Sequence, residues 1–242
     1  NRPEVFNSFN REMALSLQSI LDDCETNPEV RAIVLTGNGK AFCAGQDLKE
    51  VTNPELNPGF KKILEEHYNP IITRIRSIKK PIIGAVNGVA AGAGANIALA
   101  CDIVVAHEKV SFIQAFSLIG LIPDSAGTFF LPRLIGFQKA QALAMLGDKI
   151  SAEEADKMGM IYKVVSSEEF EETISKLATK LAHMPTKALG LIKELFNKSM
   201  TNTLEDQLAL ESKLQIEAAS SNDYAEGVAA FIEKRRPNFK GN

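Results

Sequence analysis

The chain has 242 residues, of which 45% are hydrophobic and 24% are charged, and its net charge at pH 7 is −3. This balance is typical of a soluble globular protein that is long enough to bury a substantial core. No block of like charges runs longer than two or three residues, which argues against a nucleic-acid partner. No apolar stretch approaches the roughly 20 residues that span a bilayer, so we expect no membrane partner.

The cysteines and histidines are few and widely spaced. The three cysteines form no CxxC pair, which indicates reduced thiols in a cytoplasmic protein, and no signal peptide is visible. The three histidines lie far apart in the sequence, so we expect no metal site.

The first half of the chain alternates helical and strand patterns. Apolar residues at helical spacing predict an amphipathic helix over residues 10–24 and a second over 60–75, which Pro70 should kink or break. Short apolar runs predict buried strands at residues 31–36, 81–86 and 103–106. Repetition of strand, glycine loop, helix and strand indicates the α/β class with mostly parallel pairing.

After about residue 138 the pattern becomes almost entirely helical. We expect helices over residues 138–146, 151–158, 168–183, 186–198, 203–219 and 223–235. Ser151 and Glu154 have the spacing of a capping box at the start of one of them. The sequence therefore predicts a core over residues 1–137 and a helical region over 138–242, whose apolar faces would pack subunits together.

Two glycine-containing segments each follow a predicted strand, at residues 41–48 and 87–96. Small residues allow a ligand close to the backbone, and two N–H groups directed at one carbonyl oxygen would form an oxyanion hole. Alternatively, the glycines only permit tight turns between strand and helix. The second segment begins as G-x-G, but Ile97 occupies the third small position of a dinucleotide fingerprint, and no acidic residue follows about 20 positions later.

Asp124 follows Ile122 and Pro123 in an apolar stretch. A carboxylate among apolar groups has a raised pKa and can transfer protons near neutral pH. Alternatively, Asp124 caps a helix or forms a turn after the proline.

Together, AFCAGQDL, NGVAAGAGANIALACD and LIPDSAGT resemble the crotonase (enoyl-CoA hydratase/isomerase) superfamily, and the resemblance runs from Asn1 to Phe239. It implies an α/β fold, a spiral of ββα units with a helical C-terminal trimerisation region. It also implies an oxyanion hole built from the backbone N–H groups of Gln46 and Ala93.

The same resemblance implies that the substrate carries coenzyme A and that no cofactor is bound permanently. The expected CoA-binding residues are Ala44, Gln46, Asp47 and Leu48 in the first segment, and Phe231 and Lys234 in the last helix. The latter pair often comes from a neighbouring subunit. The expected assembly is a homotrimer or hexamer, with association with a homologous hydratase left open.

The chain departs from the hydratase pattern at the two catalytic glutamates. Asn96 and Phe116 stand at those positions, and the only nearby acid is Asp124, eight residues beyond Phe116. Some isomerases and a dehalogenase of the superfamily carry their catalytic aspartate there. The local strings look most like the isomerases of phenylacetate degradation, which convert 1,2-epoxyphenylacetyl-CoA to oxepin-CoA and shift double bonds in enoyl-CoA. The resemblance thus implies an acyl-CoA isomerase with Asp124 as its acid and base.

Other activities remain open from the sequence. One is an enoyl-CoA hydratase that uses Asp124 alone, and another is a dehalogenase-like enzyme, although the chain has no tryptophan for such a site. A third is a non-catalytic subunit that binds acyl-CoA. Phe116, Phe129 and Phe130 could form an apolar wall for an aromatic acyl group, or belong to the ordinary core.

Overall fold

The computed structural model describes residues 1–242 and contains two four-stranded sheets. The first sheet has the order β1 (Ile33–Thr36), β3 (Ile82–Val86), β5 (Ile103–His107), β8 (Lys163–Val165). The second has the order β2 (Ala41–Cys43), β4 (Val89–Ala91), β6 (Ser111–Ile113), β7 (Lys149–Ser151). Every strand pair is parallel except the antiparallel pair of β6 and β7.

Successive strands alternate between the two sheets. β1, β3 and β5 belong to the first sheet, and β2, β4 and β6 belong to the second. Each turn of the spiral therefore adds one strand to each sheet. This is the expected spiral of ββα units, and the α/β class is confirmed. Sequence patterns identified β1, β3 and β5 but missed β2, β4 and β6, which have only three residues each and lie beside glycine loops.

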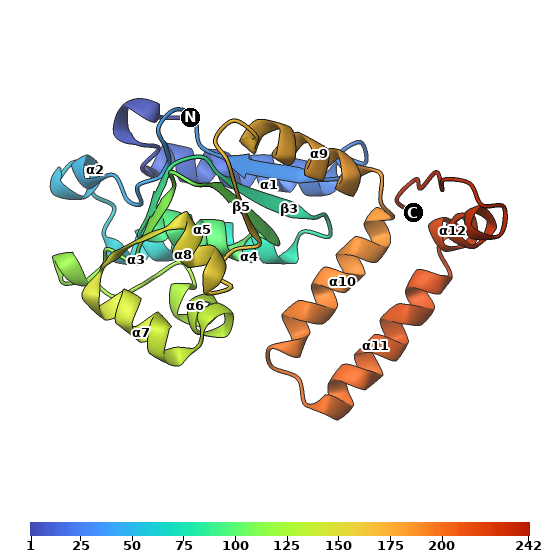
Figure 1. Ribbon diagram of the computed structural model, residues 1–242. Helices are drawn as coiled ribbons and strands as arrows, with labels where there is room; N and C mark the ends of the chain where they lie inside the picture. The colour runs from blue at the N-terminus through green and yellow to red at the C-terminus, as the bar shows by residue number, and fades with distance from the viewer.

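The helices surround the sheets and occupy most of the predicted ranges (Figure 1). In the first half they are α1 (Arg11–Thr26), α2 (Leu48–Thr52), α3 (Phe60–Lys62), a π-helical segment (Ile63–Tyr68), α4 (Asn69–Ser77) and α5 (Ala93–Ala100). Those that follow are α6 (Gly127–Ile135), α7 (Phe137–Leu146), α8 (Ala152–Lys157), α9 (Phe170–Ala182), α10 (Thr186–Ser199), α11 (Leu204–Ala219) and α12 (Asn222–Ile232). Single 3₁₀ turns cover Pro3–Val5 and Ser117–Ile119. No helix combines the length and the apolar character needed to cross a membrane.

Pro70 changes the helix without ending it. The π-helical segment runs directly into α4, and Pro70 occupies the first turn of α4. Because the helix is continuous here, Pro70 removes one backbone donor, and the Glu66 carbonyl four residues earlier accepts from Gln18 Nε2 at 2.8 Å instead. The short π-helical stretch absorbs the local change of register. The expected break at Pro70 is therefore a change in hydrogen-bond pattern.

α5 lies at the centre of the core. All eight of its residues are buried, which its composition of alanine, glycine, isoleucine and leucine around Asn96 permits. The main core cluster of 33 buried residues includes side chains from α5, both sheets and α4. A helix buried on every side is fixed in position, so the groups at its N-terminus are fixed as well.

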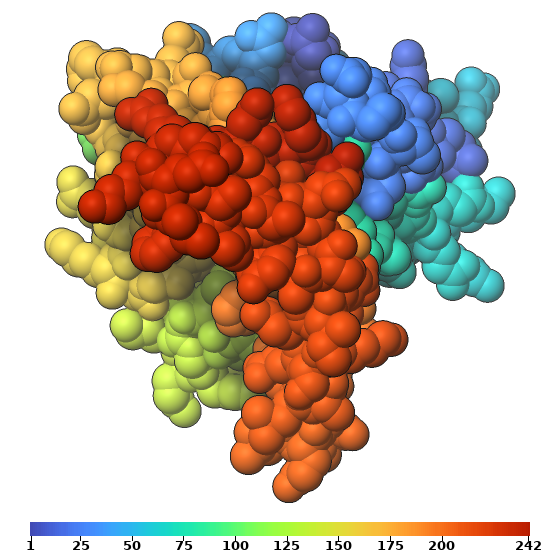
Figure 2. All heavy atoms as spheres, turned by 90° about the vertical axis from the view of Figure 1, so that its right-hand side faces the viewer, coloured from blue at the N-terminus to red at the C-terminus, as the bar shows by residue number.

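The second half of the chain contains the six predicted helices and two strands that the sequence did not indicate. The expected capping box of Ser151 and Glu154 is present at the start of α8. However, β7 pairs with β6 and β8 pairs with β5, so the sheets extend to Val165, beyond the expected boundary at residue 137. In Figure 1, α10 and α11 lie side by side and lead away from the sheets, and their connecting turn projects from the molecule in Figure 2.

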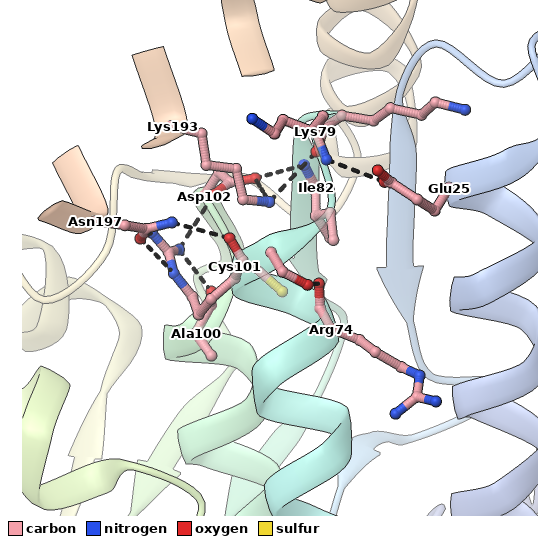
Figure 3. A network of polar contacts seen from close by, with 12 residues as sticks. Glu25, Arg74, Lys79, Ile82, Ala100, Cys101, Asp102, Lys193 and Asn197 are labelled. Carbon is pink, nitrogen blue, oxygen red and sulfur yellow. Dashed lines mark hydrogen bonds and ion pairs between the residues drawn. The ribbon is translucent and has the colours of Figure 1, made fainter. Parts of the chain in front are cut away.

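A buried ionic network fastens α10 to the sheets (Figure 3). The carboxylate of Asp102, directly before β5, accepts hydrogen bonds from Lys193 Nζ at 2.7 Å, Arg76 Nη1 at 3.1 Å and Ile82 N at 2.9 Å. Burial lowers the pKa of Lys193, while the charge of Asp102 opposes this effect. Asn197, one turn beyond Lys193, bonds both the side chain and the carbonyl oxygen of Arg76. These contacts fix the direction in which the C-terminal helices leave the core.

We expect Asp102→Ala to lower the free energy of unfolding by about 3 kcal/mol, because it leaves Lys193 and Arg76 with little solvent around them and no carboxylate partner. Urea unfolding followed by circular dichroism measures this change. The matched control is Glu172→Ala, which breaks the exposed pair with Lys176 on α9 and should leave the midpoint nearly unchanged. Equal midpoints for both variants would contradict a stabilising role for the network.

Candidate active site

The first glycine segment leaves one backbone donor free. After β2, Gly45 adopts a φ of 91°, and the chain bridges to Phe9 on both sides of Gln46. Phe9 N donates to Gly45 O at 2.7 Å and Asp47 N donates to Phe9 O at 2.8 Å. The N–H group of Gln46 lies between these two bonds and has no acceptor within the chain.

The second segment supplies another free donor. Gly92, with a φ of 53°, ends the path from β4, and Ala93 begins α5. The first N–H groups of a helix have no carbonyl four residues earlier in the helix, and Ala93 N has no other acceptor in the chain. The two segments touch, since a Cβ added to Gly45 would lie 3.6 Å from Ala93 N and 3.1 Å from Ala91 O. The sequence-predicted donors thus come from adjacent segments of backbone.

Asp124 lies in the loop before α6 and does not cap that helix. Ser125 and Ala126, with φ values of 50° and 59°, separate it from α6, which has no side-chain cap. Ser125 Oγ donates to Asp124 Oδ1 at 2.9 Å. Burial raises the pKa of Asp124 to about 6, although the bonds from Ser125 and from its own backbone act in the opposite direction. The alternative of a helix cap is therefore not observed.

Asn96 holds the Asp124 loop against α5. Its Nδ2 donates to the backbone oxygen of Asp124 at 2.8 Å, and Asn96 lies one turn beyond Ala93. The carboxylate therefore belongs to a loop that is attached to the helix whose N-terminus carries the second donor.

Tyr68 holds the side chain of Gln46 in the first segment and was not predicted from the sequence. Its hydroxyl donates to Gln46 Oε1 at 2.8 Å, and Gln46 Nε2 donates to Glu50 Oε2 at 2.7 Å. Burial raises the pKa of Tyr68 well above its ordinary value, and nearby charges, including those of Cys43, Asp124 and Glu50, raise it further. Tyr68 is 22 residues from Gln46, so no local pattern could have revealed the contact.

The three phenylalanines occupy different surroundings. Phe116 is 7% exposed and lies beside the second donor, because a Cβ on Gly92 would be 3.7 Å from its Cζ. Phe130 is buried in the core under the guanidinium of Arg76, and Phe129 lies under that of Arg133. Of the three, only Phe116 contacts a glycine segment in this way.

The expected CoA-binding residues separate into two groups. Ala44 and Leu48 are exposed beside Gln46. The carboxylate of Asp47 instead makes contacts within the fold, because it accepts hydrogen bonds from Arg2 at 2.9 Å and from Lys49 N at 3.0 Å. Phe231 is 86% exposed on α12, and the exposed Lys234 follows it. Figure 1 places α12 and α2 on opposite sides of the chain, so one subunit does not bring the two groups together.

The whole chain matches known proteins. Residues 1–242 match the family described as Enoyl-CoA hydratase/isomerase. The chain is 49% identical over 245 residues to 1,2-epoxyphenylacetyl-CoA isomerase of Escherichia coli K12, covering 100% of this chain and 93% of that protein. It is 46% identical over 241 residues to a Rhodobacter capsulatus protein named "Probable enoyl-CoA hydratase", covering 100% and 92%.

A solved structure shows the same fold. The crystal structure of an enoyl-CoA hydratase from Bacillus anthracis superposes with a TM-score of 0.92 at 34% identity, covering 100% of this chain and 93% of that one. The match in sequence and the match in fold both extend over the entire chain. The protein therefore belongs to the enoyl-CoA hydratase/isomerase, or crotonase, family of enzymes that act on CoA thioesters.

Proposed function

We propose that the protein is an isomerase of acyl-CoA thioesters that uses Asp124 as its only acid and base. The observation that carries this proposal is the half-buried carboxylate of Asp124, with its pKa raised to about 6, on the loop attached to α5. The proposed substrate is 1,2-epoxyphenylacetyl-CoA, which would become oxepin-CoA, together with enoyl-CoA whose double bond shifts. The 49% identity to an isomerase of that name supports this choice.

The backbone would activate the thioester. The N–H groups of Gln46 and Ala93 have no acceptor in the chain, so both can donate to the thioester oxygen. Negative charge develops on this oxygen when a proton leaves the α-carbon, and donors held in place for that charge lower the barrier. Because α5 is buried on all sides, its N-terminus needs little reorganisation during the reaction.

Asp124 would move the proton. As a carboxylate it accepts the proton from the α-carbon and leaves an enolate. The carboxylic acid so formed returns the proton further along the conjugated system, or assists the C–O rearrangement of the epoxide. A pKa near 6 suits both steps, since the group is mostly ionised at pH 7 and still basic enough to accept a proton.

An isomerase is favoured over a hydratase because no second acid is free beside Asp124: the nearest such group in the first segment, Glu50, accepts from Gln46 Nε2 at 2.7 Å and from Arg11 N at 2.8 Å. Burial is the main cause of the raised pKa of Asp124, Ser125 and its own backbone lower it, and no other carboxylate contributes to the shift. Asn96 and Phe116 occupy the positions of the hydratase glutamates, and neither can activate water as a base. The hydratase remains the second candidate because the Rhodobacter relative at 46% identity carries that name.

We further propose that subunits assemble through the C-terminal helices into a trimer or a dimer of trimers. Large apolar side chains on α11 and α12 are exposed in the single chain, namely Leu204, Leu208, Ile216, Phe231 and Ile232. Patches of this kind mark interaction surfaces. In such an assembly, Phe231 and Lys234 of one subunit would contact CoA bound near Ala44 and Leu48 of the next, which accounts for their separation within one chain.

Ala93→Pro should remove one oxyanion donor and keep the helix, because proline is well tolerated at the first position of a helix. We expect kcat to fall by about 10²–10³-fold, since that is the cost of losing one such donor. Gln46→Met, which changes only the side chain, should lose less. Steady-state kinetics with matched circular dichroism spectra checks both, and full activity in Ala93→Pro would exclude this donor from the mechanism.

Asp124→Asn should fold, bind CoA thioesters and lose isomerase activity by at least roughly 10²–10⁴-fold, the usual contribution of general acid–base catalysis. Exchange of the α-proton with solvent deuterium should disappear with it. The measurement uses a panel of enoyl-CoA thioesters and 1,2-epoxyphenylacetyl-CoA, followed by mass spectrometry and ultraviolet spectra. Isomerisation leaves the mass unchanged, whereas hydration adds the mass of one water.

Each alternative gives its own result in this panel. If the wild type only hydrates enoyl-CoA, the proposed function is a hydratase and not an isomerase. If the wild type binds CoA thioesters but converts none of them, the protein is a non-catalytic subunit. A folded Asp124→Asn variant with normal turnover would remove Asp124 from the catalytic role.

The same variant should also be more stable at neutral pH. The folded protein binds the Asp124 proton more tightly than the unfolded chain does, so stability falls as the pH rises from about 4 to about 6 and stays lower above that. A pKa raised from 3.8 to about 6 corresponds to roughly 3 kcal/mol at pH 7. We therefore expect Asp124→Asn to raise the free energy of unfolding by about 1–3 kcal/mol at pH 7, with little gain at pH 4. Urea titrations at both pH values measure it, and a loss of stability at pH 7 would contradict the burial of a charged carboxylate.

A further inference from the structure

Two buried amide side chains form a chain of hydrogen bonds that ends on Asp124. Gln114, directly after β6, donates from Nε2 to Asn96 Oδ1 at 2.8 Å. Asn96, in the middle of α5, donates from Nδ2 to the backbone oxygen of Asp124 at 2.8 Å. Asn96 is 1% exposed and Gln114 is 5% exposed, so water does not compete for these bonds. The two amides connect the second sheet, the central helix and the proposed catalytic loop.

The donor and acceptor of both bonds follow from the group at the end of the chain of bonds, the backbone carbonyl of Asp124. A backbone carbonyl oxygen can only accept, so the group that Asn96 presents to Asp124 is its NH₂ group. Asn96 Oδ1 must then face Gln114, and it can only accept from the NH₂ group of Gln114. No alternative flip of either amide satisfies the three groups, which makes the chain of bonds directional.

The side-chain oxygen of Gln114 lowers the stability of the fold. Its Oε1 is buried and has no hydrogen-bond partner within the chain. An unpaired buried acceptor destabilises a protein, and methionine has nearly the same shape without the polar oxygen. A glutamine at this position is therefore explained by the bond that its NH₂ group makes to Asn96, and not by a gain in stability.

The loop after Asp124 is packed directly against the Asn96 amide. A Cβ added to Gly127 would lie 2.3 Å from Asn96 Nδ2, so only glycine fits there. Gly127 N also donates to Asp124 O at 2.8 Å, which means that the oxygen accepts two bonds. Between them, Ser125 and Ala126 hold positive φ values of 50° and 59°, a conformation that non-glycine residues adopt only when their surroundings impose it. Asn96 supplies one of the contacts that impose it.

We infer that Asn96 and Gln114 are positioning residues that hold the Asp124 loop in its reactive conformation. Asn96 acts on the loop directly, and Gln114 acts through Asn96 by fixing the orientation of its amide. This inference rests on the proposed role of Asp124. It assigns a function to the side chain that occupies a glutamate position of the hydratases: Asn96 uses its polar group on the neighbouring loop, so that group is not available to bind a water molecule beside the substrate.

Loss of these bonds should change turnover and not substrate binding. The CoA and oxyanion contacts lie in other segments, while a shift of about 1 Å at a reacting group can reduce the rate by about 10²-fold. We expect Asn96→Ala to lower kcat by about 10²-fold, and Gln114→Met to lower it by about 10-fold, with KM changed less than about 3-fold in both. A residue that only stabilises the fold would leave kcat per folded molecule unchanged.

The matched control is Gln18→Met. Gln18 is also a buried glutamine, 9% exposed, and its Nε2 also donates a 2.8 Å bond, in this case to Glu66 O beside α1. It should keep kcat within about 2–3-fold of the wild type, although it loses the same kind of bond. In the double variant Asn96→Ala/Gln114→Met, kcat should fall no further than in Asn96→Ala alone, because Gln114 acts only through Asn96.

The outcomes separate this inference from the proposed function. If the wild type isomerises, Asp124→Asn is inactive and the Asn96 and Gln114 variants turn over normally, then the inference is wrong and the proposed function stands. If the wild type does not isomerise any CoA thioester, the proposed function itself is wrong. Should Asn96→Ala fail to fold, Gln114→Met decides alone, because it keeps the packing volume and exchanges one unpaired buried acceptor, Gln114 Oε1, for another, Asn96 Oδ1. A normal kcat in folded Gln114→Met would then overturn the inference.

Discussion

The close approach of backbone segments at the glycine positions is the constraint on which the candidate site depends. A Cβ on Gly94 would lie 2.3 Å from Cys43 O, and one on Gly88 would lie 2.2 Å from Lys40 O. These contacts bring the loop after β2 against the start of α5 with no side chain between them. Two N–H groups from residues far apart in the sequence can converge on one oxygen only if the backbones are this close. The glycines therefore permit the geometry of the proposed donors as well as the turns.

A second condition is the burial of α5 and of the loop that it holds. The helix is surrounded by the two sheets and α4, and its polar side chain, Asn96, finds its partners inside the protein. The same apolar surroundings make a charged Asp124 unfavourable and raise its pKa to about 6. In the proposed mechanism, this loss of stability at neutral pH accompanies a carboxylate that can both accept and return a proton.

Much of the fold could be predicted from the sequence, because long elements leave periodic patterns. The helices over residues 10–24, 186–198 and 203–219 and the strand over 81–86 were predicted within about three residues. Strands of three residues such as β2, β7 and β8 were missed, since a strand of that length has no measurable alternation. Pairing with a distant neighbour, as of Val105 with Lys163, determines them instead.

In the candidate site, too, residues with a local sequence signature could be predicted and those defined by distant contacts could not. Asp124 and the glycine segments were predicted because each has a local sequence signature. Tyr68, Gln114 and the bond from Asn96 to Asp124 were not, since their partners lie 18 to 28 residues away in the chain. The sequence shows only that Asn96 occupies a position where hydratases have a glutamate. The contacts of its amide are visible only in the structure.

The alternation of strands between the two sheets has a consequence for how such enzymes diversify. The first turn of the spiral contributes Gln46, the second contributes Ala93, and the acid follows β6 in the third. The proposed oxyanion donors are therefore encoded separately from the proposed acid and base. A substitution in the third turn can relocate the acid, or change the reaction that it performs, while the first two turns keep their geometry. If the proposed donors bind the thioester carbonyl, evolution can in this way exchange one chemistry for another while that recognition stays constant.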